Sequence, residues 1–301
     1  ALREFSCVPG SRPFLYKITP RRRKENYMSH FSLAVFTKDS NFNLDEIMEP
    51  YDENKMIAPY ILVTKEEAIQ NKRKFYESQY QNCFLPWQKD PMAYESRHSA
   101  EHIKDIKTLP ELMKQSDEQI YQNVISDYTE EEIDADGNIL STYNPNSKWD
   151  WYEVGGRWRG LLLLKPGIKG PYPESSLKTQ SGEFYRADAA YTSEVDFERI
   201  SAEYAATLWP YEEAMKDSFF KEEYMRMRFP TEEEYIEHKR FKTFAVLTPD
   251  GVWHAPGEMG WFGVSSDTPE GERNWDFGYY NNFIKPAIVK QWYMTIVDCH
   301  I

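Results

Sequence analysis

The sequence has few cysteines and no long apolar segment, and each shortage excludes a class of protein. Its 301 residues include three cysteines, Cys7, Cys83 and Cys299, and no Cys-x-x-Cys pair. This odd count without paired spacing argues against a disulfide framework and a structural zinc site, and we expect no metal or cofactor. No apolar run is longer than four residues, the length of Leu161–Leu164, whereas a membrane-spanning helix needs roughly 18 to 20.

Positive charge is also scarce. The chain holds 36 Lys and Arg against 49 Asp and Glu, a formal charge of −13. Residues 1–27 carry seven basic and two acidic residues, so residues 28–301 carry −18. Since nucleic-acid affinity depends on clustered Lys and Arg, we expect no direct nucleic-acid binding by residues 28–301. The first 27 residues also lack the apolar stretch of a secretory signal, so the cytoplasm is the expected location.

Residues 1–27 have two interpretations. The chain opens on Ala1, and purine-rich triplets, like those of a bacterial ribosome-binding site, would encode Arg21–Glu25. This favours translation that begins at Met28, with residues 1–27 derived from upstream DNA. The alternative is a disordered basic arm that binds nucleic acid or an acidic partner.

Strand patterns lie at both ends of residues 28–301, and helix patterns lie between them. Strands are expected at 28–37, 242–248, 252–254 and 293–301, with a tight turn at 249–251. Helices are expected at 64–80, 108–128, 194–209, 211–228 and 231–241, the first two opened by capping boxes, and a long loop at 166–192. The pattern predicts one α+β domain with a mainly antiparallel sheet of N- and C-terminal strands and several helices inserted between them. Alternatives are a helical subdomain at 193–241 and a division into two domains.

The most distinctive segment is Lys148–Gly160, which has three tryptophans and a Gly155-Gly156 pair. Two glycines between alternating runs predict a hairpin over 148–165 with a two-residue turn. One hairpin face would then carry Trp149, Trp151, Trp158 and Leu162, with Glu153 at the tip, and the other Asp150, Tyr152, Arg157, Arg159 and Leu161.

These faces suggest a binding site. Tyr152, Arg157 and Arg159 are candidates for binding an anionic ligand such as a nucleotide, since Arg pairs with phosphate and an aromatic ring stacks on a base. Glu258 and Trp261, in a glycine-rich loop, are candidates for the wall of a pocket. The alternative is that the tryptophans pack in the core and the arginines are solvated.

Three residues of the terminal strands are candidates for acid–base catalysis. Asp298 and His300 share one face of the last strand, Cys299 points the other way, and His30 lies in the first strand. If the two strands are neighbours, these residues form an acid–base or metal cluster with Glu258. The alternative is a set of hydrogen-bonded polar residues that closes the sheet edge. His98 and His102 have the spacing of a metal pair, but a solvated helix face is the preferred interpretation.

The chain resembles a family of uncharacterised proteins from phages, prophages and other bacterial genomes. The resemblance rests on His30-Phe31, Pro50–Asn54, Tyr143–Pro145, Lys148–Gly160, Gly257–Trp261 and the terminal Val297–Ile301. It spans residues 28–301 and implies a bacterial or phage cytoplasm, with translation starting at Met28. It implies no activity, cofactor or catalytic residue.

Two functional hypotheses follow. The first is a non-enzymatic binding protein, such as an acidic modulator of a host protein with a basic surface, because the strongly negative body resembles a competitor for nucleic-acid-binding sites. The second is an enzyme or sensor that binds a small anionic ligand through the tryptophan–arginine hairpin. The first is preferred because no catalytic constellation is decisive.

Overall fold

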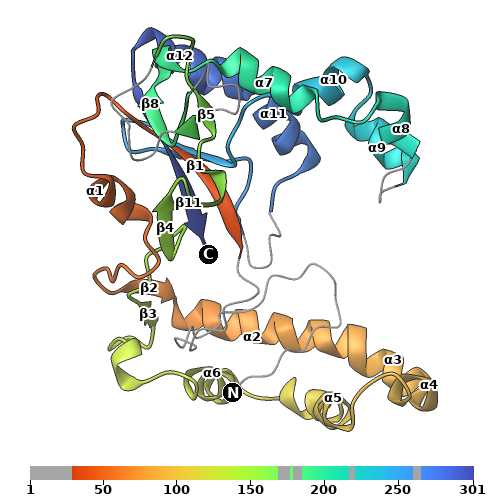
Figure 1. The fold of residues 1–301 in the computed structure, drawn as a ribbon. Helices are drawn as coiled ribbons and strands as arrows, with labels where there is room; N and C mark the ends of the chain where they lie inside the picture. Colours follow the sequence, from red (N-terminus) through yellow and green to blue (C-terminus); the bar gives the residue numbers. More distant parts are fainter. Residues whose placement is uncertain (1–28, 169–176, 179–184, 217–220, 260–265) are drawn as a thin grey trace. The chain divides into compact units, whose positions relative to one another are not determined.

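The computed structural model describes residues 29–168, 177–178, 185–216, 221–259 and 266–301. The predicted arm 1–27 lies outside them. The described chain divides into two compact units (Figure 1). One comprises residues 56–143, and the other comprises residues 29–55 together with 144–301.

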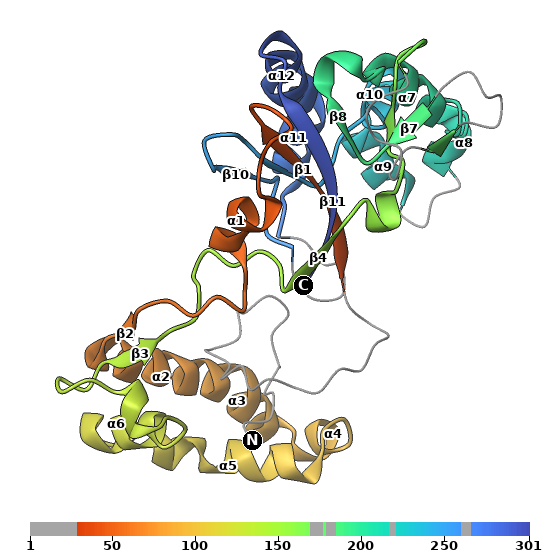
Figure 2. The same cartoon turned by 60° about the vertical axis from the view of Figure 1, so that its left-hand side comes forward.

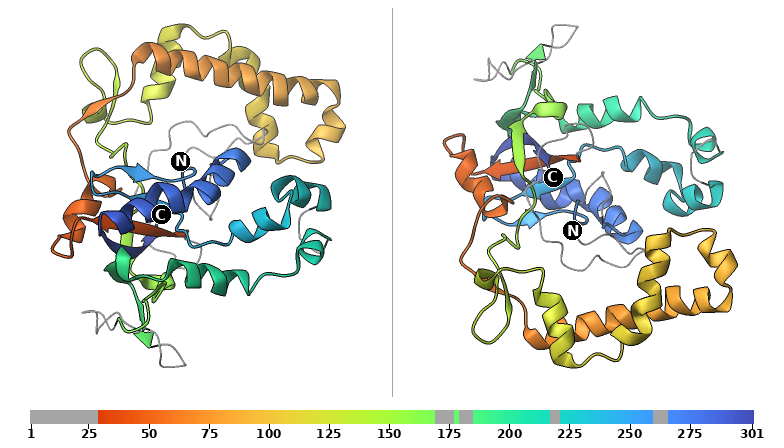
Figure 3. Two further views of the ribbon diagram at one scale, coloured as in Figure 1. Left: turned by 90° about the horizontal axis from the view of Figure 1, so that it is seen from above. Right: turned by 90° about the horizontal axis from the view of Figure 1, so that it is seen from below.

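The first unit is mostly helical. A two-stranded ribbon pairs β2 with β3, and the long helix α2 packs against α5 and α6 (Figures 1 and 3). The predicted capping box is confirmed at its start, where Thr64 and Glu67 satisfy each other's backbone N–H groups. The elements are β2 Tyr60–Val63, α2 Lys65–Gln79, α3 Leu85–Lys89, α4 Pro91–Glu95, α5 Ala100–Leu112, α6 Asp117–Ile125, a 3₁₀ turn Glu130–Glu132 and β3 Ile139–Ser141.

The predicted helix over 108–128 is wrong. Its proposed cap, Thr108, lies inside α5, and its hydroxyl donates to the carbonyl of Asp105. The helices begin instead at Ser99 and Ser116, whose side chains accept backbone N–H groups at the N-termini of α5 and α6. The capping-box pattern thus occurs twice within twelve residues, and the one that contains Pro110 does not begin a helix.

A π-helical turn continues a long helix in each unit. Tyr80–Phe84 joins α2 to α3, and Tyr280–Ile284 joins α11 to α12. Both turns have the sequence Tyr-x-Asn-x-x-x-Pro. The proline lacks an N–H and its ring clashes with the preceding turn, so the helix widens to an i→i−5 hydrogen bond just before it.

The second unit is built on a six-stranded mixed sheet in the order β10-β9-β1-β11-β4, with β8 also paired to β11. The terminal strands β1 and β11 share this sheet, as predicted, and they are antiparallel neighbours along their full length. The turn before Val252 is confirmed too, because β9 and β10 pair across it. The strands are β1 His30–Thr37, β4 Trp151–Val154, β8 Ala189–Tyr191, β9 Ala245–Leu247, β10 Trp253–His254 and β11 Tyr293–His300.

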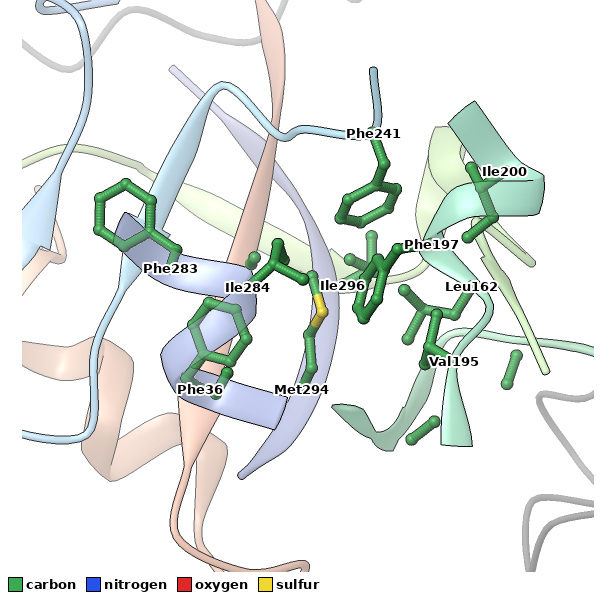
Figure 4. Packing of buried hydrophobic residues seen from close by; sticks show 14 of the residues in the cluster. Phe36, Leu162, Val195, Phe197, Ile200, Phe241, Phe283, Ile284, Met294 and Ile296 are labelled. Carbon is green, nitrogen blue, oxygen red and sulfur yellow. The ribbon is translucent and has the colours of Figure 1, made fainter. Parts of the chain in front are cut away.

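Helices cover the two faces of this sheet. On one face Phe36, Met294 and Ile296 pack against α7 and against the helix that runs from α11 into α12 (Figure 4). On the opposite face Leu33 and Cys299 pack with α1. The helices are α1 Leu44–Met48, α7 Phe197–Ala205, α8 Tyr211–Lys216, α9 Glu222–Arg228, α10 Glu232–Glu237, α11 Pro269–Tyr279 and α12 Lys285–Val289, with 3₁₀ turns Glu49–Tyr51 and Thr192–Glu194.

Two sequence predictions in this unit need correction. The hairpin over 148–165 is wrong, because β4 pairs with β11 and the chain after the glycines forms a 3₁₀ turn, Gly156–Trp158. The long loop over 166–192 is also wrong where it contains strands, since β7 pairs with β5 and β8 with β11. The small side strands are β5 Leu162–Leu163, β6 Leu177–Lys178 and β7 Tyr185–Ala187. Helices are present within 193–241 as predicted, but the one expected over 211–228 is two, α8 and α9, because Lys221 is extended and stands at the N-cap of the second.

No helix in the described part of the chain is long and apolar enough to cross a membrane.

Candidate functional site

One face of the central sheet changes from apolar to polar along its strands. His30 is the first residue of β1 and His300 the last of β11, and the register pairs them directly. Asp298 follows on the same face because side chains alternate along a strand. The C-terminal end of β11 lies beside β4 (Figure 2), which adds Trp151 opposite His300. The result is a cluster of ionisable and aromatic side chains at one end of the sheet.

Each histidine of this cluster is held by a carboxylate. Nδ1 of His30 lies 2.8 Å from Oδ1 of Asp298, and Nδ1 of His300 lies 2.5 Å from Oδ1 of Asp150. A carboxylate only accepts hydrogen bonds, so Nδ1 carries the hydrogen in both rings. The neutral form of each ring then has its lone pair at Nε2, which is the orientation a general base requires.

The two histidines differ in access to solvent. His30 keeps 12% of its side chain exposed, whereas His300 has none exposed. The rings are 5.0 Å apart in a T-shaped arrangement, and Trp151 stacks on His300 at 4.9 Å. Nε2 of His300 has no hydrogen-bond partner among the described residues. A ligand therefore reaches His30 first, while His300 lies behind the indole ring.

The glycine turn after β4 is fixed by two buried carboxylates. Asp298 uses its second oxygen to accept the backbone N–H of Arg157 at 2.9 Å, and Asp188 accepts the N–H of Gly160 at 2.5 Å. Gly156 has a φ of +46°, and a Cβ there would lie 2.4 Å from Asp298. The turn thus needs glycine for both conformation and space. Its amides bind carboxylates of the protein itself, and Asp298 links the turn to His30.

A second group of carboxylates lies next to Asp150. The backbone N–H of Glu53 donates to the carbonyl of Trp149, and the Asn54 amide donates to the carbonyl of Asp150. Burial raises the pKa of Glu53, and the negative charges of Asp150 and Asp52 raise it further, against a smaller opposite effect of His300. The loop thus concentrates negative charge beside the His300–Asp150 pair.

The sequence-predicted catalytic residues are brought together, apart from Glu258. His30, Asp298 and His300 are in one cluster. Glu258 is exposed and forms an ion pair with Lys148 at 2.7 Å.

The sequence-predicted ligand residues do not form one surface. Tyr152 is on the opposite sheet face, where it packs against Trp149 and its hydroxyl donates to Asp45. Arg157 and Arg159 are exposed, and Arg157 contacts the cluster through its backbone. Trp261 lies outside the described residues.

Sequence reasoning assigned no site role to Asp150, Trp151 and Glu53. Asp150 and Trp151 precede and begin β4, and only the pairing of β4 with β11 brings them to His300. The alternation of polar and aromatic residues around Asp150 and Trp151 does indicate a strand. The Gly155-Gly156 pair, however, favoured a hairpin partner for this strand rather than β11. In the described residues no three His, Cys, Asp or Glu side chains are grouped so that they could hold a metal ion.

The chain matches no protein-family model, no curated protein and no solved structure. The candidate site therefore rests on its geometry.

Proposed function

We propose that this protein binds a small polar ligand at the polar end of its central sheet, and that His30 exchanges a proton with that ligand. The observation that carries the proposal is the pair of imidazoles, each oriented by a carboxylate at Nδ1. Histidine is the side chain that gains and loses a proton most readily near neutral pH. Such a site suits an acid–base enzyme or a proton-linked sensor.

The free-energy cost of burying ionisable side chains supports the proposal. His300 and Asp298 are almost fully buried, and burying ionisable groups is unfavourable unless they are paired. An apolar pair at the same positions would extend the core at no such cost. Polar groups retained in a buried sheet end, beside a partly exposed histidine, are typical of functional sites.

The acidic-modulator hypothesis has less geometric support. In each of two acidic runs, residues 130–132 and 232–234, one carboxylate already has a partner in the fold. Glu132 accepts the N–H of Thr129, and Glu234 pairs with Arg273. The modulator remains a prediction from net charge alone.

Native mass spectrometry of the full 301-residue chain, purified gently from a bacterial host, tests ligand binding. We expect a retained small-molecule adduct that His30→Gln loses. The matched control is His254→Gln, because His254 lies on the same sheet and its Nε2 contacts the hydroxyl of Thr248. An adduct that survives in His30→Gln would contradict the proposal.

A second measurement addresses the site itself. Long-range ¹H–¹⁵N spectra report which imidazole nitrogen carries the proton, and we expect the Nδ1-protonated form for neutral His30 and His300. Protonation of both rings at Nε2 would remove the orientation on which the proposal depends.

A further inference from the structure

Trp151 offers an open aromatic surface at the candidate site. His300 stacks on the indole with an interplanar angle of 18°, and His30 approaches it edge-on at 5.5 Å. The side chain nevertheless remains 40% exposed. His300 covers one face of the ring, and the rest of the indole surface is only partly covered. The face of tryptophan is the best aromatic surface for attracting a cation.

Three carboxylates lie in the part of the chain that meets this surface, and the described lysines and arginines form no ion pair with them. Asp150 contacts His300, on which the indole stacks, and Glu53 lies close enough to both for their charges to affect its pKa. Glu153 is exposed on the same sheet face, opposite Asp298. Within the described chain no lysine or arginine forms an ion pair with any of these three. Lys55 and Lys148 pair with Glu49 and Glu258 instead, and the exposed Arg157 and Arg159 of the following turn form no ion pair with these carboxylates.

We propose that the ligand is a small organic cation, an amine that carries a proton near neutral pH, held against the exposed part of the Trp151 ring and by Glu53 and Asp150. This inference rests on the proposed function and specifies its ligand. A cation is attracted by these carboxylates and by the negative face of the indole at once, whereas an anion is repelled by both. The expected nucleotide-like anion is thus disfavoured at this end of the sheet.

The test measures the binding of three probes to the full chain. Isothermal titration calorimetry gives the affinity, and the NMR signals of the indole N–H groups report which tryptophan is affected. Choline carries a permanent positive charge and probes recognition of a cation, and 3,3-dimethylbutan-1-ol has the same shape with a carbon in place of the charged nitrogen. Inorganic phosphate represents an anion. We expect choline to bind about 5- to 30-fold more tightly than its neutral analogue, the range of a cation–π contact in a partly desolvated site.

Two variants assign the binding to this surface. Trp151→Leu and Glu53→Gln should each weaken choline binding, and Glu53→Gln keeps the stacked indole in case Trp151→Leu disturbs the fold. Trp209→Leu is the matched control, because Trp209 is also exposed but lies in the loop between α7 and α8. It should leave choline binding unchanged.

The outcomes separate this inference from the proposed function. Equal affinity for choline and its neutral analogue, or choline binding that Trp151→Leu and Glu53→Gln leave unchanged, overturns the cation. Phosphate binding that His30→Gln abolishes, without choline binding, overturns the cation and leaves the proposed site standing. Binding of no probe, combined with Nε2-protonated histidines, overturns both.

Discussion

The two ends of one sheet face show how the same backbone can serve different purposes. At one end β1 and β11 present Phe36, Met294 and Ile296, which pack against helices (Figure 4). At the other end the same two strands, in the same unbroken register, present His30 and His300. The register determines which residues are cross-strand neighbours. The chemistry of those side chains determines whether the contact stabilises the fold or forms a site.

The ends differ in what burial does to stability. Each buried apolar side chain contributes about 1.5–3 kcal/mol, because it leaves water for a packed environment. The buried His300 and Asp298 gain little from burial, since their hydrogen bonds only offset the loss of water. The apolar end therefore supports the polar end, and mutations at the two ends should have separable effects.

The largest expected effect is at the apolar end. Ile296→Ala should lower the free energy of unfolding by about 2–5 kcal/mol, because Ile296 is fully buried and its removal leaves a cavity. Urea unfolding followed by circular dichroism measures the change. Val289→Ala is the control, since Val289 is 77% exposed and truncation to alanine there should cost less than about 0.5 kcal/mol. A loss below about 1 kcal/mol in Ile296→Ala would place the main core elsewhere.

A smaller loss is expected at the turn that supports the polar end. Gly156→Ala should cost about 1–3 kcal/mol, because a non-glycine residue is strained at positive φ and the new Cβ meets Asp298. The same unfolding assay measures it. Gly251→Ala is the matched control: its φ of +79° imposes similar strain, but nothing lies within 4 Å of its Cβ position. Equal losses in both variants would show that the close approach to Asp298 has no energetic effect.

Asp298→Asn should cost less again, about 1–2 kcal/mol. Asp298 accepts from both His30 and the backbone of Arg157, and an asparagine has only one oxygen for these two donors. Its NH₂ group then faces a donor unless His30 moves its hydrogen to Nε2. We expect that shift in long-range ¹H–¹⁵N spectra.

Glu153→Gln is the control for this substitution. Glu153 is exposed on the same face, so its stability and the tautomer of His30 should not change. Retention of the Nδ1-bound hydrogen in Asp298→Asn would contradict the role of Asp298 in orienting His30.

Much of the apolar end was predictable from sequence. Alternation in 28–37 and 293–301 indicated two strands with one buried face each, and their terminal positions favoured pairing. That pairing alone predicts that His30 and His300 meet with Asp298 nearby. Alternation works here because each strand is long enough for a period of two to be clear.

The rest of the polar end depends on long-range partners that a local pattern does not encode. Gly155-Gly156 predicted the positive φ values correctly. It did not reveal that buried carboxylates would hold the turn or that β4 would pair with β11. The sequence therefore does not identify Asp150, Trp151 and Glu53 as site residues, because each is brought to the site by backbone contacts with distant segments.

The pH dependence of stability also separates the two ends. Asp188 holds the glycine turn at the polar end, and Asp276 lies in α11, which covers the apolar end. Burial raises the pKa of Asp188 above 3.8, against the hydrogen bond from Gly160. Burial also acts to raise the pKa of Asp276, but His238 and Lys242 outweigh it and lower that pKa. The folded state therefore holds the Asp188 proton more tightly than the unfolded state does and the Asp276 proton less tightly.

The two groups should change stability in opposite directions as the pH changes. The stability that protonated Asp188 contributes is complete below its ordinary pKa and is lost as pH rises through the raised value. The contribution of Asp276 is present above its ordinary pKa and is lost as pH falls through the lowered value. Relative to wild type, Asp188→Asn should gain stability as the pH rises above 3.8, and Asp276→Asn should lose it as the pH rises toward 3.8, as thermal unfolding on both sides of this pH will measure. Parallel trends in the two variants would contradict the contrast between these carboxylates.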